Sequence, residues 1–164
     1  MKHMIKATLI AVGTGSVWSP SLLAQTRPTQ RPAAANPPIV AACSLMSKEE
    51  VKRHLPWRPQ LDQFDAEEEQ LGSYGSACEY PSVRVQVMPF VQATIDSARK
   101  KSGIATVGGV GDEAYLYNNA NRYAELYVKV GGRLLTLQAN VSSSFDEVRR
   151  GVVAMAKVLV AKLR

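Results

Sequence analysis

Cysteine and histidine are scarce in this chain of 164 residues, and long hydrophobic runs are absent. Two cysteines and two histidines cannot supply a zinc ribbon, an iron–sulfur cluster or a histidine-based metal site, so we expect no metal and no cofactor. No apolar stretch reaches the roughly 18 residues that a membrane-spanning helix needs. Hydrophobic residues make up 46% of the chain and charged residues 21%, which favours one folded domain over a disordered chain.

The basic excess of the chain is concentrated near its N-terminus. Lys and Arg outnumber Asp and Glu by 20 to 14 overall, but residues 43–164 hold 16 basic and 14 acidic residues, a net charge of +2. Their longest basic runs, at 99–101 and 149–150, are short and typical of solvated helix surface. Nucleic-acid binding needs a clustered basic face, so we expect no nucleic-acid partner.

Residues 1–24 have the pattern of a secretory signal peptide. Lys2 and Lys6 supply a positive start, a short apolar stretch follows, and Ala24 is a small residue suited to cleavage. An uncleaved membrane anchor is the alternative, but the stretch is too short and too rich in Gly and Ser. We therefore expect export to the periplasm or the extracellular space.

The remaining chain divides into a tether and one domain. Residues 25–38 contain four prolines among small and polar residues, which predicts a flexible linker. The single α+β domain is expected to span residues 39–164.

The two cysteines, Cys43 and Cys78, are expected to form a disulfide, because the chain is predicted to enter an oxidising compartment. Closing a loop of 34 intervening residues stabilises a domain by roughly 3–4 kcal/mol if strain is small. The alternative is a lipid anchor, because residues 40–43 resemble a bacterial lipobox. A lipobox directly follows the apolar part of the leader, however, and here the polar linker intervenes. A redox or catalytic cysteine lacks the C-x-x-C spacing.

Capping and periodicity predict an α+β fold with an antiparallel sheet of about four to six strands. Ser47 and Glu50 form a capping box at the start of a helix, and Ser144 caps a long amphipathic C-terminal helix. Gly131-Gly132 predicts a hairpin turn that pairs Val128 with Leu135. One or two shorter helices complete the packing, mainly on one side of the sheet. We expect strands at 78–80, 83–88 and 114–117, a hairpin at 123–141, and helices at 47–55, 93–101 and from 144 onward.

Few residues are placed for catalysis. His54 is the only histidine after the predicted leader, and no nucleophile-elbow motif accompanies it. Glu67–Glu69, in a stretch from 56 to 75 without a clear period, predicts a solvated loop, and Glu113 is the other carboxylate candidate. The glycines of 108–111 indicate a tight turn rather than a phosphate loop, because no Gly-Lys-Ser/Thr follows.

Four tyrosines on two neighbouring predicted strands form the remaining unusual feature: Tyr115, Tyr117, Tyr123 and Tyr127, flanked by Arg122. If Tyr117 lies opposite Tyr123, all four tyrosines share one face of the sheet and make a platform for a ligand or protein partner. If Tyr117 instead lies opposite Arg122, Tyr115 turns toward the core. Cross-strand packing under a loop is the alternative to a binding role.

The order of these features resembles a known group of proteins. The features are Cys43 followed by Ser-Leu-Met-Ser, Cys78-Glu79-Tyr80, the segment Gly-Val-Gly-Asp-Glu-Ala-Tyr at 109–115, a Gly-Gly hairpin and a terminal helix. The chain is similar, over 43–164, to small exported bacterial domains and lipoproteins of unassigned function, which are related to extracellular sensor domains of serine/threonine kinases. The resemblance implies a sheet covered by helices, related to the PsbP-like fold, and a binding or sensing role without a catalytic residue set.

These observations favour a non-enzymatic exported domain that binds a small ligand or an envelope protein through the less apolar face of its sheet. A protein inhibitor of an exported hydrolase, acting through loops 56–75 or 118–121, is the first alternative. A carboxylate-dependent hydrolase that uses Glu113 is the second.

Overall fold

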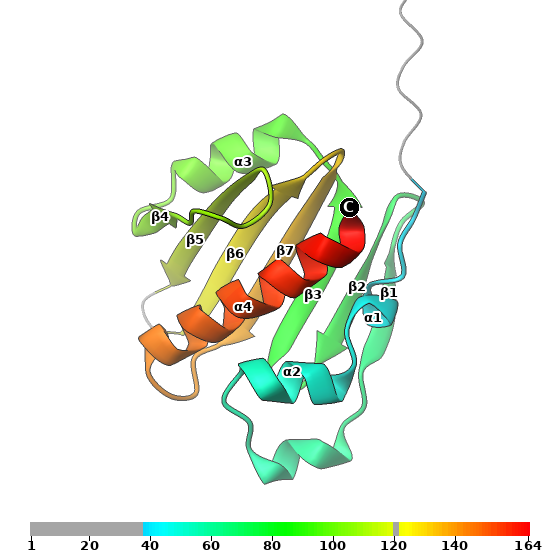
Figure 1. The fold of residues 1–164 in the computed structure, drawn as a ribbon, viewed down its shortest axis with the longest axis vertical. Coiled ribbons are helices and arrows are strands. Elements are labelled where there is room, and N and C mark those ends of the chain that lie inside the picture. The colour runs from blue at the N-terminus through cyan, green and yellow to red at the C-terminus, as the bar shows by residue number, and fades with distance from the viewer. Residues whose placement is uncertain (1–37, 120–121) are drawn as a thin grey trace, which may run out of the picture. The chain divides into compact units, whose positions relative to one another are not determined.

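The computed structural model describes residues 38–119 and 122–164, which form a seven-stranded antiparallel sheet with helices (Figure 1). The predicted signal peptide, residues 1–24, and residues 25–37 of the predicted linker lie outside the described residues. The strand order across the sheet is β1-β2-β3-β7-β6-β5-β4. The strands are β1 (Glu67–Leu71), β2 (Gly75–Tyr80), β3 (Val83–Pro89), β4 (Ile104–Thr106), β5 (Glu113–Asn119), β6 (Tyr123–Val130) and β7 (Arg133–Asn140). The helices are α1 (Ala42–Leu45), α2 (Lys48–His54), the 3-10 helix η1 (Pro59–Gln63), α3 (Gln92–Arg99) and α4 (Phe145–Leu163).

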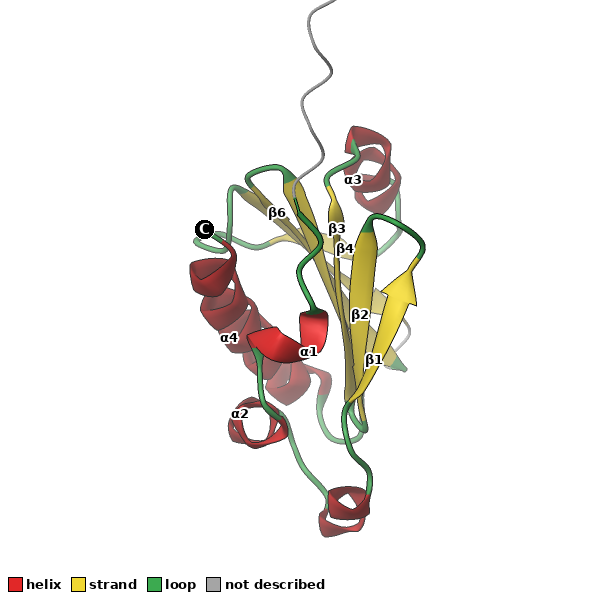
Figure 2. Ribbon diagram, turned by 90° about the vertical axis from the view of Figure 1, so that its right-hand side faces the viewer, coloured by secondary structure: helices red, strands yellow, loops and turns green. Residues whose placement is uncertain are grey.

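One face of the sheet carries the main hydrophobic core, and α1, α2 and α4 cover it (Figure 2). Helix α4 places Val152, Met155 and Leu159 against this face, and each of them is buried. Alternate residues of the central strands, such as Leu126 and Leu137, meet them from the sheet. The α+β class expected from the sequence is therefore confirmed.

Helix α3 lies on the opposite face of the sheet, apart from the other helices (Figure 2). Its Ile95 and Ala98 pack against Tyr127 and Leu134 in a second, smaller cluster. The expectation that helices lie mainly on one side thus holds for α1, α2 and α4. Because α3 is short, it covers only part of its face.

The predicted capping and hairpin features are confirmed. Ser47 and Glu50 make both hydrogen bonds of the capping box, and these bonds, together with Lys162, lower the pKa of Glu50 to about 2. Strands β6 and β7 pair Val128 with Leu135, as the Gly-Gly turn predicts. No helix in the described part of the chain is long and apolar enough to cross a membrane.

The sheet has two edge strands that the sequence pattern does not reveal. Glu67–Glu69, expected in a solvated loop, belong to β1, which pairs with β2 from Glu67↔Glu79 to Leu71↔Gly75. That expectation is wrong because an exposed edge strand draws its stability from backbone pairing and needs no hydrophobic alternation. Strand β4 is short, and the sequence pattern does not indicate it either. It is identified as a strand by its backbone pairing with β5. With β1 and β4 included, the sheet has seven strands.

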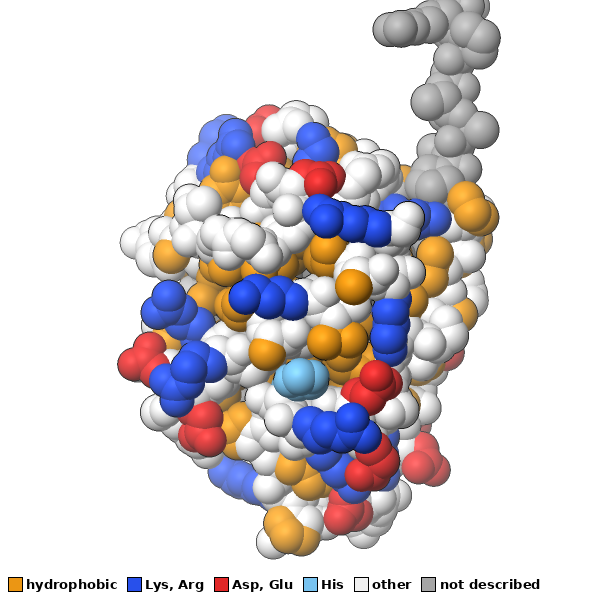
Figure 3. All heavy atoms as spheres, in the orientation of Figure 1, with side chains coloured by type: hydrophobic (Ala, Val, Ile, Leu, Met, Phe, Trp, Pro, Cys, Tyr) orange, Lys and Arg blue, Asp and Glu red, His pale blue; other side chains and the backbone are white. Residues whose placement is uncertain are grey.

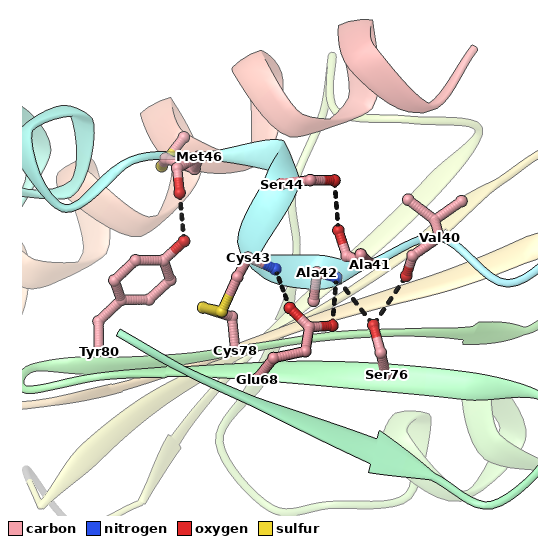
Figure 4. Close-up of a disulfide and its surroundings, with 10 residues drawn as sticks. All are labelled: Val40, Ala41, Ala42, Cys43, Ser44, Met46, Glu68, Ser76, Cys78 and Tyr80. Atoms are coloured by element: carbon pink, nitrogen blue, oxygen red, sulfur yellow. Dashed lines mark hydrogen bonds between the residues drawn. A yellow bond between two sulfur atoms is a disulfide. The ribbon is translucent and has the colours of Figure 1, made fainter. Parts of the chain in front are cut away.

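The predicted disulfide between Cys43 and Cys78 is confirmed and joins α1 to β2 across a Cα–Cα distance of 4.9 Å (Figure 4). Hydrogen bonds surround it. Glu68 of β1 accepts from the backbone amides of Ala42 at 2.8 Å and Cys43 at 2.6 Å. The Ser76 hydroxyl also accepts from the Ala42 amide at 2.8 Å, and it donates to a carbonyl of the same segment. We call this group of contacts the N-terminal clamp.

The glycine-rich segment before β5 is a tight turn, as expected. Gly109 and Gly111 both have positive φ, but only Gly111 lies against another strand. A Cβ at Gly111 would collide with the backbone carbonyl of Lys129 in β6, whereas a Cβ at Gly109 would meet nothing within 4 Å. The following Asp112 donates its amide to the same Lys129 carbonyl at 2.8 Å. The segment therefore requires glycine at 111 for close approach of two backbones.

Substituting these two glycines separates backbone strain from collision. Gly109→Ala should destabilise the domain by about 1–2 kcal/mol, the cost of a left-handed residue with a side chain. Gly111→Ala should cost roughly 1–3 kcal/mol more, because the new methyl group also displaces the Lys129 carbonyl. Urea unfolding of both variants measures the difference, and equal stabilities would contradict the close approach.

Candidate functional site

We call the sheet surface that bears Tyr115, Tyr117, Tyr123 and Tyr127 the tyrosine face. Tyr115 lies opposite Tyr127, and Tyr123 lies opposite Asn119. Both registers considered from the sequence are therefore wrong, since neither places Tyr117 opposite Glu125, where the structure has it. The four tyrosines nevertheless share a face, because each paired position preserves the two-residue alternation of the strands.

Arg99, at the end of α3, holds the first part of this face. Its Nε donates to the Tyr115 hydroxyl at 2.7 Å, and its guanidinium also binds the Glu113 carboxylate. The Tyr115 hydroxyl donates in turn to Glu113 at 2.7 Å. The hydrogen bond to Tyr115 and the charge of Glu113 raise the pKa of Arg99. Glu113 is thus a partner in an ion pair and has a structural role here.

Lys101, just beyond α3, holds the second part. Its Nζ donates to Glu125 at 2.8 Å and to the Tyr127 hydroxyl, and it lies 4.7 Å from the ring centres of both Tyr117 and Tyr127. Burial opposes the charge of Lys101, but the hydrogen bonds to Glu125 and Tyr127 prevail and raise its pKa. Burial raises the pKa of Tyr127 to about 12. The tyrosine face therefore contains an internal cation–π cluster.

The part of the tyrosine face near the β5–β6 turn is more open. Tyr117 and Tyr123 are partly exposed and form an edge-to-face pair with ring centres 6.4 Å apart. Arg122 is exposed beside Tyr123, while Tyr127 is 7% exposed and belongs to the cluster under α3. We call Tyr117, Tyr123 and Arg122 the tyrosine corner. Partly exposed aromatic rings can stack on a planar group or pack against a protein surface, and an exposed arginine close in sequence can add a charged contact.

The two cations that organise this site, Arg99 and Lys101, are not evident from the sequence pattern. Residues 99–101 look like solvated helix surface, yet Arg99 and Lys101 reach across to β5 and β6. The available signal was the presence of two acidic residues, Glu113 and Glu125, that could pair with this basic run. These ion pairs can be recognised only when the position of α3 on the sheet is known.

The other candidate residues from the sequence, His54 and the two cysteines, are engaged in contacts within the fold. His54 ends α2, and its backbone carbonyl packs against Gly151 of α4, where a Cβ would collide with it. Among the described residues, one group of potential metal ligands comes together, namely Cys43, Glu68 and Cys78. Both of its sulfur atoms are joined in the disulfide, so they do not offer thiolates to a metal.

Comparison with known proteins gives no match to this chain, whether with protein-family models, curated proteins or solved structures. The resemblance to exported bacterial domains and kinase sensor domains therefore stays a prediction.

Replacing Lys101 tests whether the cation–π cluster stabilises the tyrosine face. Lys101→Met should lower the free energy of unfolding by about 1 kcal/mol, because it removes a charge-assisted hydrogen bond to Glu125 at a partly exposed site. Lys100→Met is the matched control, since Lys100 is exposed and, among the described residues, its side chain forms no hydrogen bond or salt bridge. Urea unfolding should show a loss only for Lys101→Met; equal effects would mean that the cluster adds nothing to stability.

Proposed function

We propose that this protein is a non-enzymatic exported domain that binds a small ligand or an envelope protein at the tyrosine corner. The observation that carries the proposal is the partial exposure of Tyr117 and Tyr123 beside the exposed Arg122. Tyrosine and arginine are enriched at the energetic centres of binding surfaces. Lys101 also restrains one of these rings, because its Nζ lies over Tyr117 at 4.7 Å from the ring centre. Such pre-organisation lowers the entropy that binding must overcome.

Export is the second part of the proposal and has two supports. The predicted signal peptide would direct the chain out of the cytosol, to the periplasm or beyond the cell. The Cys43–Cys78 disulfide agrees with this, because disulfides form and persist in oxidising compartments. The same disulfide argues against the lipid anchor, since acylation would need the sulfur atom of Cys43.

Binding is favoured over catalysis by the state of the candidate carboxylate. Glu113 is engaged by Arg99 and Tyr115, which is the environment of a structural ion pair. A hydrolase built on Glu113 would have to break these contacts before the carboxylate could act on a substrate. We therefore place the carboxylate-dependent hydrolase behind the binding function.

Inhibition of an exported hydrolase is a second candidate function, and one observation favours it. Phe64, in the predicted loop 56–75, is 53% exposed at the rim of a hollow of about 300 Å³. Leu61 and Pro81 add apolar surface to that hollow. An exposed aromatic side chain next to a hollow is a feature that a protein partner can use as an anchor.

Affinity capture from envelope extract distinguishes these functions. The immobilised domain and a Tyr74→Ala control should retain the same ligand or protein, since Tyr74 is an exposed tyrosine in the β1–β2 turn, far along the sheet. A Tyr117→Ala/Tyr123→Ala variant should lose it while keeping its circular dichroism spectrum. Retention of the same partner by all three proteins would contradict binding at the tyrosine corner.

The inhibitor function gives a different result in the same experiment. It predicts stoichiometric capture of one hydrolase that survives the tyrosine substitutions and is lost in Phe64→Ala.

A further inference from the structure

The two edges of the sheet differ in how they are protected. Edge strands present unpaired backbone groups, and proteins often guard them with charged side chains. Strand β1 carries Glu67–Glu69, whereas β4 carries Ile104, Ala105 and Thr106 and has no charge. The β4 edge is therefore chemically open to pairing with another strand.

The backbone at this edge is oriented for such pairing. Val107 donates its amide to the carbonyl of Ala114 in β5 at 2.9 Å. Backbone groups of an antiparallel strand alternate between its two sides, so the amide and carbonyl of Thr106, one residue earlier, face away from β5. An added strand would meet these groups directly.

A cleft of about 600 Å³ lies between this edge and helix α4. Thr106 and Val107 line it from the sheet, and Arg149, Arg150 and Val153 line it from one side of the helix. Lys and Arg side chains are visible on the surface around α4, next to apolar patches (Figure 3). The cleft thus has a mixed polar and apolar lining, with a cationic wall formed by Arg149 and Arg150 beside the open edge.

The two arginines of this wall have no acidic partner within the described part of the chain. Among residues 38–119 and 122–164, neither Arg149 nor Arg150 forms a salt bridge, and both are exposed. Asp146 is the one acidic residue that lines the cleft, so the described wall carries a net positive charge. An anionic occupant would complement it.

We propose that the β4 edge and this cleft bind an extended acidic peptide segment of a partner protein. The segment would add a strand beside Ile104–Thr106 and direct alternate carboxylates toward Arg149 and Arg150. Backbone pairing would supply affinity without sequence preference, and the arginines would select acidic side chains. This site lies at the β4 edge and along α4, separate from the tyrosine corner.

A second copy of the chain fits this site less well. Its acidic edge β1 is the obvious candidate strand, but Glu68 is bound to the amides of the N-terminal clamp and Glu69 is paired with Arg84. These carboxylates are therefore already engaged within their own molecule.

The test uses a synthetic octapeptide of alternating Glu and Val, acetylated and amidated, added to the ¹⁵N-labelled domain. We expect saturable amide shifts at β4 and along α4, and slower hydrogen exchange of the Thr106 amide. Two comparison peptides isolate the causes: one replaces Glu by Lys, and one replaces two Val by Pro, which removes strand pairing and keeps the charge. Neither should bind detectably. Equal binding of the proline peptide would overturn strand addition.

Charge substitutions provide the second arm. Arg149→Gln/Arg150→Gln should raise the Kd for the Glu–Val peptide at least about tenfold. Arg53→Gln/Lys100→Gln removes the same charge from exposed residues outside the cleft and should change the Kd by less than about twofold in 0.15 M salt. If both variants weakened binding equally, overall charge would account for the effect, and the proposed site would be overturned. Self-association of the free domain through β4, detected by sedimentation, would overturn it in favour of a second copy.

Discussion

The Cys43–Cys78 bond is the constraint on which the described domain depends. Helix α1 has four residues, too few to be stable alone, and β1 exposes nearly all of its side chains. Neither element buries enough apolar surface to hold itself in place. The disulfide fixes α1 to β2, and Glu68 then ties β1 to the amides of α1. The clamp therefore organises one edge of the sheet and sets the entry of the chain into α2.

The main hydrophobic core includes the segment that the disulfide anchors to the sheet. Leu45 and Met46, next to the disulfide, are buried in the same cluster as Val51 of α2 and the apolar stripe of α4. The Tyr80 hydroxyl donates to the Met46 carbonyl, and burial raises the pKa of Tyr80 to about 12. Long-range packing between the first and last helices thus depends on a segment that a covalent bond holds to the sheet.

The two faces of the sheet have separate roles as a consequence. Helices α1, α2 and α4 occupy the core face, while α3 covers only part of the opposite face. The uncovered remainder is where Tyr117, Tyr123 and Arg122 lie. A ligand can therefore occupy this face without disturbing the core, whereas the proposed peptide site lies elsewhere, at the β4 edge beside α4.

Local sequence rules predicted the elements whose stability is local. The Ser47–Glu50 capping box and the Gly131-Gly132 turn each favour one local backbone geometry. Both geometries are present in the structure. Strand β1 could not be predicted in this way, because its pairing with β2 is a tertiary contact. The β5–β6 register likewise depends on the conformation of the turn after Asn119, which spacing alone does not define.

The candidate site was predicted only in part for the same reason. Strand alternation predicts that Tyr123 and Tyr127 lie on the same face of the sheet. The face on which Tyr115 lies depends on the register of β5 and β6, which alternation does not define. The roles of Arg99 and Lys101 could not be inferred, because they arise from the docking of α3 on the face opposite the core. When several separate elements form a site, the sequence pattern shortens the list of residues that could belong to it. The pattern does not define the contacts between those residues.

Alkylation of the native protein recovered from the exported fraction tests the central claim most directly. The fraction is treated with iodoacetamide under denaturing conditions without reductant, and the peptides that contain Cys43 and Cys78 are identified by mass spectrometry. We expect one disulfide-linked peptide pair and no alkylated cysteine. Alkylation of both cysteines in correctly exported, folded protein would show that the N-terminal clamp forms without a covalent bond and would contradict the account.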